Sequence, residues 1–191
     1  MRNTTVLSYE KNKVSVKAQT AAAILAIAGA VVVPQAFHAA GAALGLGSGL
    51  GAAFLPMHIP VILAAFLAGP FAGAAAGLLG PLAAYLISGM PAMALLPFMM
   101  IELCGYGVLA GIAKDIKAPA VLKVIGVMIG GRAAKAASIL FAVYVIGTES
   151  IAVQSIWLSV KEGLPGIVLQ LILIPVILHI VERSKDEKQL G

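Results

Sequence analysis

Charge is scarce in this sequence. Of its 191 residues, 11% are charged and 61% are hydrophobic, against roughly 25% charged residues in ordinary soluble domains. The mean hydropathy is +1.03, and Glu102 is the single charged residue between Ala18 and Ala113. A chain of this length has no interior large enough to hide such a run, and a soluble domain would need a charged face there. A soluble fold is therefore excluded, and lipid is the expected solvent.

Cysteine and the common catalytic motifs are also missing. Cys104 is the single cysteine, which excludes a disulfide framework and a paired-thiol metal site. No GxxxxGK[ST] or HExxH stretch occurs, the glycines of residues 41–51 lack GxGxxG spacing, and Ser48 does not stand in a rhomboid-type GxSG. His58 has no second ligand three or four residues away. We therefore predict no enzyme, no metal and no cofactor in this chain.

Continuous apolar runs are what the sequence does contain. They do not alternate with period two, so they predict membrane helices and not a β-barrel. Six spans are expected, over residues 18–37, 52–87 (crossing twice), 92–113, 124–146 and 165–181. The predicted fold is an all-α membrane bundle at residues 17–182, with a cytoplasmic tail at each end, residues 1–16 and 183–191.

Three segments of this bundle have a distinctive composition. Glycine and proline at 69–70 predict the turn between the second and third helices, and Pro56 and Pro60 predict a bent or broken helix near His58. Residues 38–51 hold five glycines in eleven positions and are expected to form a loop, either a lid over a binding site or a plain connection. Residues 149–162 are a mixed, amphipathic connection.

The net charge of +5 indicates topology and not nucleic-acid binding. Six spans put both termini on one side of the membrane. If that side is the cytoplasm, the positive-inside rule is satisfied, because ten of the thirteen basic residues lie in inner segments: Arg2, Lys11, Lys13, Lys17, Lys114, Lys117, Lys123, Arg183, Lys185 and Lys188.

Small residues recur every four positions in two helices. Ala18, Ala22, Ala26 and Ala30 form a smooth stripe on the first helix, and glycines at 69, 73 and 77 do the same on the third. The glycines predict close packing on a neighbouring helix. The alanine stripe has two interpretations, packing within this protein or docking of a partner.

Three ionisable side chains fall within predicted spans. Each costs about 2.5–3.5 kcal/mol to insert, so it is expected to face a cavity or a partner. Glu102 and Arg132 either pair with each other and lock two helices, or form the polar floor of a binding site. Lys135 shares a helix face with Arg132 or extends to the interface.

Other candidate residues accompany these charges. Tyr106 lies one helical turn beyond Glu102, and Gln170 offers both donors and an acceptor. His58 is either a hydrogen-bonded histidine that fixes the helix break or a ligand-binding group. Methionines 57, 90, 93, 99 and 100 are expected to be adaptable packing, some of them lining an apolar wall.

The sequence resembles the substrate-specific (S) components of bacterial energy-coupling factor (ECF) vitamin transporters. The resemblance covers residues 17–181 and is carried by short stretches: Leu55-Pro-Met-His-Ile-Pro-Val61, Gly69-Pro70, Gly89-Met-Pro91, Glu102-Leu-Cys-Gly-Tyr-Gly107, Gly131-Arg132, Pro165-Gly-Ile-Val-Leu-Gln170 and Ile174-Pro175. The alanine stripe is similar to the AxxxA docking motif of that family.

The resemblance implies a high-affinity binding subunit in a bacterial plasma membrane. Such a subunit captures a B vitamin or precursor near the outer face and docks on a membrane scaffold subunit that carries two ATPases, which hydrolyse the ATP. Candidate substrate-binding residues are Met57, His58, Glu102, Tyr106, Arg132, Lys135 and Gln170, and candidate docking residues are Ala18, Ala22 and Ala26.

Two questions stay open at this point. The basic pair of Arg132 and Lys135 favours an acidic vitamin such as pantothenate. Glu102 instead favours a weakly basic heterocycle such as a thiamin or cobalamin precursor. The alternative function is a stand-alone carrier or channel for small solutes, although no inverted repeat is visible in the helix lengths.

Overall fold

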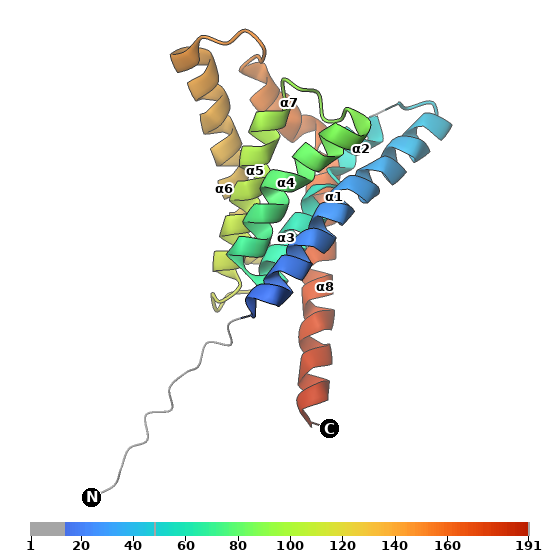
Figure 1. The fold of residues 1–191 in the computed structure, drawn as a ribbon, viewed down its shortest axis with the longest axis vertical. Coiled ribbons are helices and arrows are strands. Elements are labelled where there is room, and N and C mark those ends of the chain that lie inside the picture. The colour runs from blue at the N-terminus through green and yellow to red at the C-terminus, as the bar shows by residue number, and fades with distance from the viewer. Residues whose placement is uncertain (1–13, 48, 191) are drawn as a thin grey trace, which may run out of the picture.

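The computed structural model describes residues 14–47 and 49–190, and in this part of the chain the secondary structure is helical. In Figure 1, α6 and α8 run steeply from top to bottom, whereas α1 and α4 run obliquely. Their bounds are α1 Val16–Ala43, α2 Gly49–Phe54, α3 His58–Ala68, α4 Pro70–Ser88, α5 Leu96–Ala113, α6 Ala120–Phe141, a π-helical turn Ala142–Ile146, α7 Gln154–Glu162 and α8 Leu164–Leu190.

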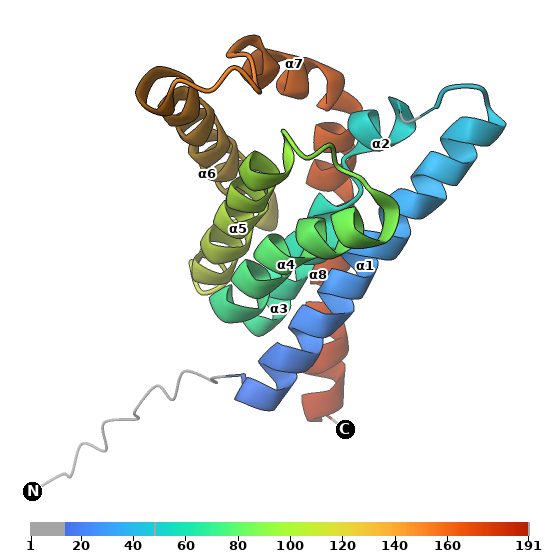
Figure 2. The same cartoon turned by 45° about the horizontal axis from the view of Figure 1, so that its top comes forward.

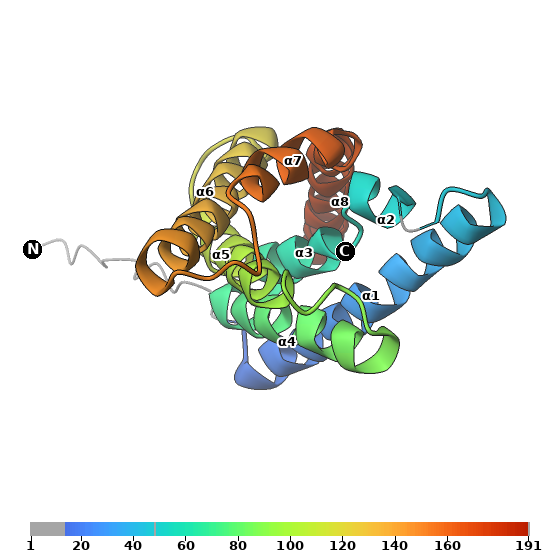
Figure 3. The ribbon, with the colours of Figure 1, turned by 90° about the horizontal axis from the view of Figure 1, so that it is seen from above.

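Six segments of the described chain are long and apolar enough to cross a membrane, by length and composition. They are Val16–Ala43, Gly49–Ala68, Pro70–Ser88, Leu96–Ala113, Ala120–Ile146 and Leu164–Ser184. The six-span prediction is therefore confirmed. The short helix α3 lies at the centre, because it packs against α1, α4, α5 and α8 (Figure 3).

Glycine permits the close crossing of α4 and α5. A Cβ added at Gly73 would meet the backbone of Gly107, and one added at Gly77 would meet the backbone of Leu103. Gly69 has a φ of +110° and ends α3 just before Pro70 begins α4. The predicted turn and the predicted close packing of the third span are both confirmed.

The second span is broken, as the prolines predict. Helix α2 ends at Phe54, Leu55 has a φ of +49°, and α3 begins at His58. Pro56 has no N–H to continue the first helix, and Pro60 lies in the first turn of the second, where its missing N–H costs no hydrogen bond. The break turns His58 into the protein interior, where it is 2% exposed.

The predicted loop at residues 38–51 is largely wrong. Helix α1 continues to Ala43 and α2 begins at Gly49. Residues 39–43 contain four alanines, whose helix propensity outweighs the unfavourable propensity of Gly41. Gly45 and Gly47, with φ of +71° and +56°, then end α1 and turn the chain.

Other helix ends differ by a few residues from those expected. Helix α5 begins at Leu96 and not at 92, α6 begins at Ala120 and not at 124, and α8 continues beyond 181 to Leu190. In α8 the apolar run ends where predicted, but the helix extends into the charged segment, where Arg183 donates to Glu187 one turn later at 3.2 Å.

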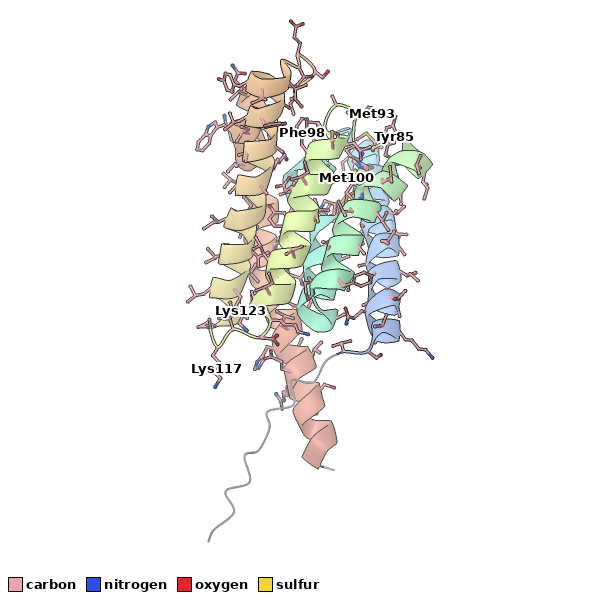
Figure 4. The ribbon with its side chains drawn as sticks, turned by 60° about the vertical axis from the view of Figure 1, so that its left-hand side comes forward. Tyr85, Met93, Phe98, Met100, Lys117 and Lys123 are labelled. Carbon is pink, nitrogen blue, oxygen red and sulfur yellow. The ribbon has the colours of Figure 1, made fainter. Side chains whose placement is uncertain are left out.

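Several basic residues lie at one end of the molecule. Helix α1 begins and α8 ends at that end (Figure 1), and Figure 4 shows Lys117 and Lys123 there and Met93 at the opposite end. Arg2, Lys11, Lys13 and most of the predicted tail 1–16 lie outside the described residues. The amphipathic connection contains the helix α7, which lies with α2 at the end away from the termini (Figure 2).

Candidate functional site

A cavity of about 310 Å³ lies between the helices, toward the end that carries α2 and α7. Its rim includes the partly exposed Met90 (38%) and Leu95 (40%), and its floor includes the buried His58 (2%) and Glu102 (1%). It is lined by Pro34, Gln35, His38, Gly51, Ala52, Leu55, Pro56, Met57, His58, Ala84, Met90, Pro91, Ala92, Leu95, Met99, Glu102, Arg132, Lys135, Ser159 and Glu162. The cavity therefore runs from an exposed rim to a polar floor.

The floor is organised around the carboxylate of Glu102. Lys135 Nζ lies 2.8 Å from Glu102 Oε2, and the Tyr106 hydroxyl donates to Glu102 Oε1 at 2.9 Å. Two helices supply these groups: Glu102 and Tyr106 are one turn apart on α5, and Lys135 comes from α6. Each carboxylate oxygen thus has one strong partner, as a buried charge requires.

Small residues let α5 and α6 approach closely enough for this pair. A Cβ added at Gly131 would meet the ring of Tyr106, and one added at Gly105 would lie 3.3 Å from the Cα of Gly131. The Tyr106 ring therefore occupies the space that a side chain at position 131 would fill. This contact fixes the ring and, through its hydroxyl, the position of Glu102.

The expected pair between Glu102 and Arg132 is not the one that forms. Glu102 pairs with Lys135, and Lys135 therefore does not extend to the interface; its side chain is 15% exposed. Arg132 lines the cavity, and its Nε and Nη2 atoms are buried with no hydrogen-bond partner among the described residues. The structure thus separates the basic pair into a neutralised lysine and an unpaired arginine.

His58 is not the hydrogen-bonded histidine that one interpretation expected. Its Nε2 lies 3.9 Å from Glu102 Oε1, too far for a hydrogen bond, and within the described chain neither ring nitrogen has a hydrogen-bond partner. The ring lies against Tyr106, with centroids 5.3 Å apart. The helix break and the contact with Tyr106 hold His58 in place, and within the described chain its ring nitrogens are left for a bound group.

The remaining predicted binding residues divide into two groups. Met57 lines the cavity, together with Met90 and Met99. Tyr106 and Gln170 are not among the lining residues, and both are fully buried. Tyr106 instead supports Glu102 from behind, and Gln170 is held on α8 near Ile174, which is part of the main apolar core.

Sequence reasoning missed four polar lining residues. Gln35 and His38 come from the part of α1 assigned to its end and to the following loop. Ser159 and Glu162 come from α7, which lies in the segment that the sequence predicts as a connection. The available signal was the spacing of Ser159 and Glu162, three residues apart on one face of an amphipathic helix.

The alanine stripe divides along α1. Ala18 is exposed and Ala22 is half-buried, whereas Ala26 is 5% and Ala30 0% exposed. A Cβ added at Gly80 on α4 would lie 2.9 Å from the Cβ of Ala30. The inner half of the stripe is therefore packing within this protein, which removes Ala26 from the free surface, and docking stays a prediction for Ala18 and Ala22.

The six spans and the cavity between them define a multi-pass helical membrane protein with a cavity of small-molecule size. Residues 20–178 match the family model described as "ECF transporter, substrate-specific component". The chain belongs to this family, which is a family of transporter components and not of enzymes. No curated protein and no solved structure matched the chain.

Proposed function

We propose that this chain captures a B vitamin or a vitamin precursor from outside a bacterial cell. In this proposal the protein spans the plasma membrane with both termini in the cytoplasm, and it delivers its substrate inward when docked on a scaffold subunit with two ATPases. The cofactor-free chain supplies binding, and its partners supply ATP hydrolysis.

One observation carries the proposal. The cavity combines apolar walls with an unpaired Arg132 and a His58 whose ring nitrogens are unpartnered among the described residues. Polar groups at this depth are costly unless something binds them. A few convergent polar groups in an apolar cavity are also the usual composition of a small-molecule site. The family supports the coupling to an ATPase module.

Native mass spectrometry of the full chain, purified in mild detergent, tests the binding step. We expect a small organic molecule to remain bound to the wild-type chain. The Ala84→Phe variant should lose that molecule. Ala84 lines the cavity and is 2% exposed, so the larger aromatic ring at this position would occupy cavity space. Ala21→Phe is the matched control, since Ala21 is exposed on α1. An empty wild-type chain, or equal occupancy in both variants, would contradict the proposal.

Uptake in cells tests the coupling step. Cells that carry the chain together with the scaffold and both ATPases should accumulate the compound that native mass spectrometry identifies. Cells that carry the chain alone should bind the compound without accumulating it. Equal accumulation in the two strains would instead indicate a stand-alone carrier.

A further inference from the structure

The charges at the cavity floor do not cancel. Arg132 and Lys135 contribute two positive charges and Glu102 one negative charge, which leaves a net charge of +1 at the floor. Lys135 is committed to Glu102 at 2.8 Å, and the second oxygen of Glu102 accepts from Tyr106. The surplus positive charge therefore belongs to Arg132.

The unpartnered atoms of Arg132 have a definite chemistry. Nε and Nη2, both buried and unpartnered in the described chain, form one edge of the planar guanidinium, with two parallel N–H groups. That edge matches the two oxygens of a carboxylate and binds it with paired hydrogen bonds. Arg132 as a whole is half-buried and lines the cavity, and a rotation of its long side chain would present this buried edge to a group bound there.

Charge balance selects among anions. A monoanion would neutralise the floor, whereas a doubly charged phosphate ester would leave an uncompensated negative charge at this depth. A cation would meet the existing surplus of positive charge. Glu162, the other acidic lining residue, is exposed at the rim, where solvent and salt screen its charge.

The rest of the cavity describes the body of the ligand. The walls are largely apolar, with Pro34, Met57, Leu95 and Met99 among them. A volume of about 310 Å³ is at the small end of the range of roughly 300–1,000 Å³ for small-molecule sites. His58 adds an imidazole that can bind one further polar group.

We infer that the substrate is a small monocarboxylic acid with a mainly apolar body, and that Arg132 binds its carboxylate while Lys135 and Glu102 hold the floor in shape. This inference rests on the proposed function and narrows its substrate class. It assigns to Arg132 the specificity for acids over their neutral analogues.

Matched acid and amide pairs test the inference on the purified full chain. The probes are nicotinate with nicotinamide, biotin with biotinamide, lipoate with lipoamide, and pantothenate with its alcohol panthenol, and thiamin and pyridoxine represent cationic and neutral vitamins. Binding is measured by calorimetry, and native mass spectrometry identifies any compound that co-purifies. We expect an acid, among the probes or as the co-purified compound, to bind about 30-fold or more tightly than its neutral analogue, because a buried charged partner is lost.

Variants at position 132 locate that preference. Arg132→Gln should remove the difference between acid and neutral analogue, and Arg132→Lys should retain part of it, because the charge stays while the fork is lost. Arg183→Gln is the matched control, since Arg183 is 75% exposed on α8. The thermal midpoint of each unliganded variant separates lost binding from lost folding.

The outcomes distinguish the inference from the proposed function. If the tightest or co-purified compound has no carboxylate, or if Arg132→Gln retains the acid preference, the inference is wrong and the proposed function stands. If no probe binds and nothing co-purifies, the proposed function fails and the inference fails with it.

Discussion

Removal of Lys135 should destabilise the protein more than removal of any exposed charge. Lys135→Met keeps a long unbranched side chain but leaves the Glu102 carboxylate, 2% exposed, without its ion-pair partner at 2.8 Å. Two estimates indicate the size of the lost unfolding free energy. Breaking one partner of a buried pair costs about 3–5 kcal/mol, and Coulomb's law at 2.8 Å gives ~6 kcal/mol at an effective dielectric constant of ~20.

Thermal unfolding in detergent measures this loss. Cys104 is the single cysteine and is half-buried two residues from Glu102, so a thiol-reactive dye reports the opening of this region. A loss of 3–5 kcal/mol corresponds to a decrease of about 6–20 °C in the midpoint for a domain of 150–250 residues. The exposed pair of Arg183 and Glu187 is the control, and Arg183→Gln should cost about 0.5 kcal/mol or less.

A double variant decides whether charge is the cause. Glu102→Gln with Lys135→Met removes both charges, and Gln still accepts the Tyr106 hydroxyl. Because replacing a whole buried pair is often neutral, the double variant should recover most of the lost stability. The reasoning is refuted if Lys135→Met unfolds within about 2 °C of the wild type, a shift of no more than ~1 kcal/mol, or if the double variant is as unstable as the sum of the single variants.

Two further predictions concern helix contacts. Gly131→Ala should lower the free energy of unfolding by about 1–3 kcal/mol, because the added methyl group would overlap the Tyr106 ring. The control is Gly126→Ala on the same helix, where an added methyl group meets no atom within 4 Å. It should be neutral or stabilising in the same unfolding assay. Ala18→Trp should abolish uptake by the assembled transporter and leave binding to the purified chain intact. Ala28→Trp, exposed on α1 away from the stripe, is its control, and equal uptake by the two variants would exclude docking at Ala18.

Features that depend on local chemistry could be predicted from the sequence. The six spans follow from unbroken apolar runs, the turn before α4 from Gly69 and Pro70, and the break before α3 from Pro56 and Pro60. None of these features depends on which helices become neighbours, because each is determined by hydropathy or by backbone restriction within a few residues.

Features that depend on helix neighbours could not be predicted. Ala18, Ala22, Ala26 and Ala30 are equivalent in the sequence, yet their burial increases along α1. Ala18 is exposed, Ala22 is half-buried beside the cluster of Ala23, Ala68 and Ala72, and Ala30 lies against Gly80 of α4. The polar face of α7 is similar. The spacing of Ser159 and Glu162 can be seen in the sequence. Their position at the cavity mouth depends on the path of the chain between α6 and α8.

The choice of partner for Glu102 is the clearest case, and it follows from one small residue. Arg132 and Lys135 are three apart on α6, so either can reach a carboxylate on α5, and a sequence pattern gives no preference. The Tyr106 ring packs on α6 at Gly131 and places the Glu102 carboxylate within 2.8 Å of Lys135. Arg132, next to Gly131, then has no carboxylate partner among the described residues. The glycine that permits the helix crossing therefore also leaves one cation at the cavity floor, the group to which we assign the binding of an acid.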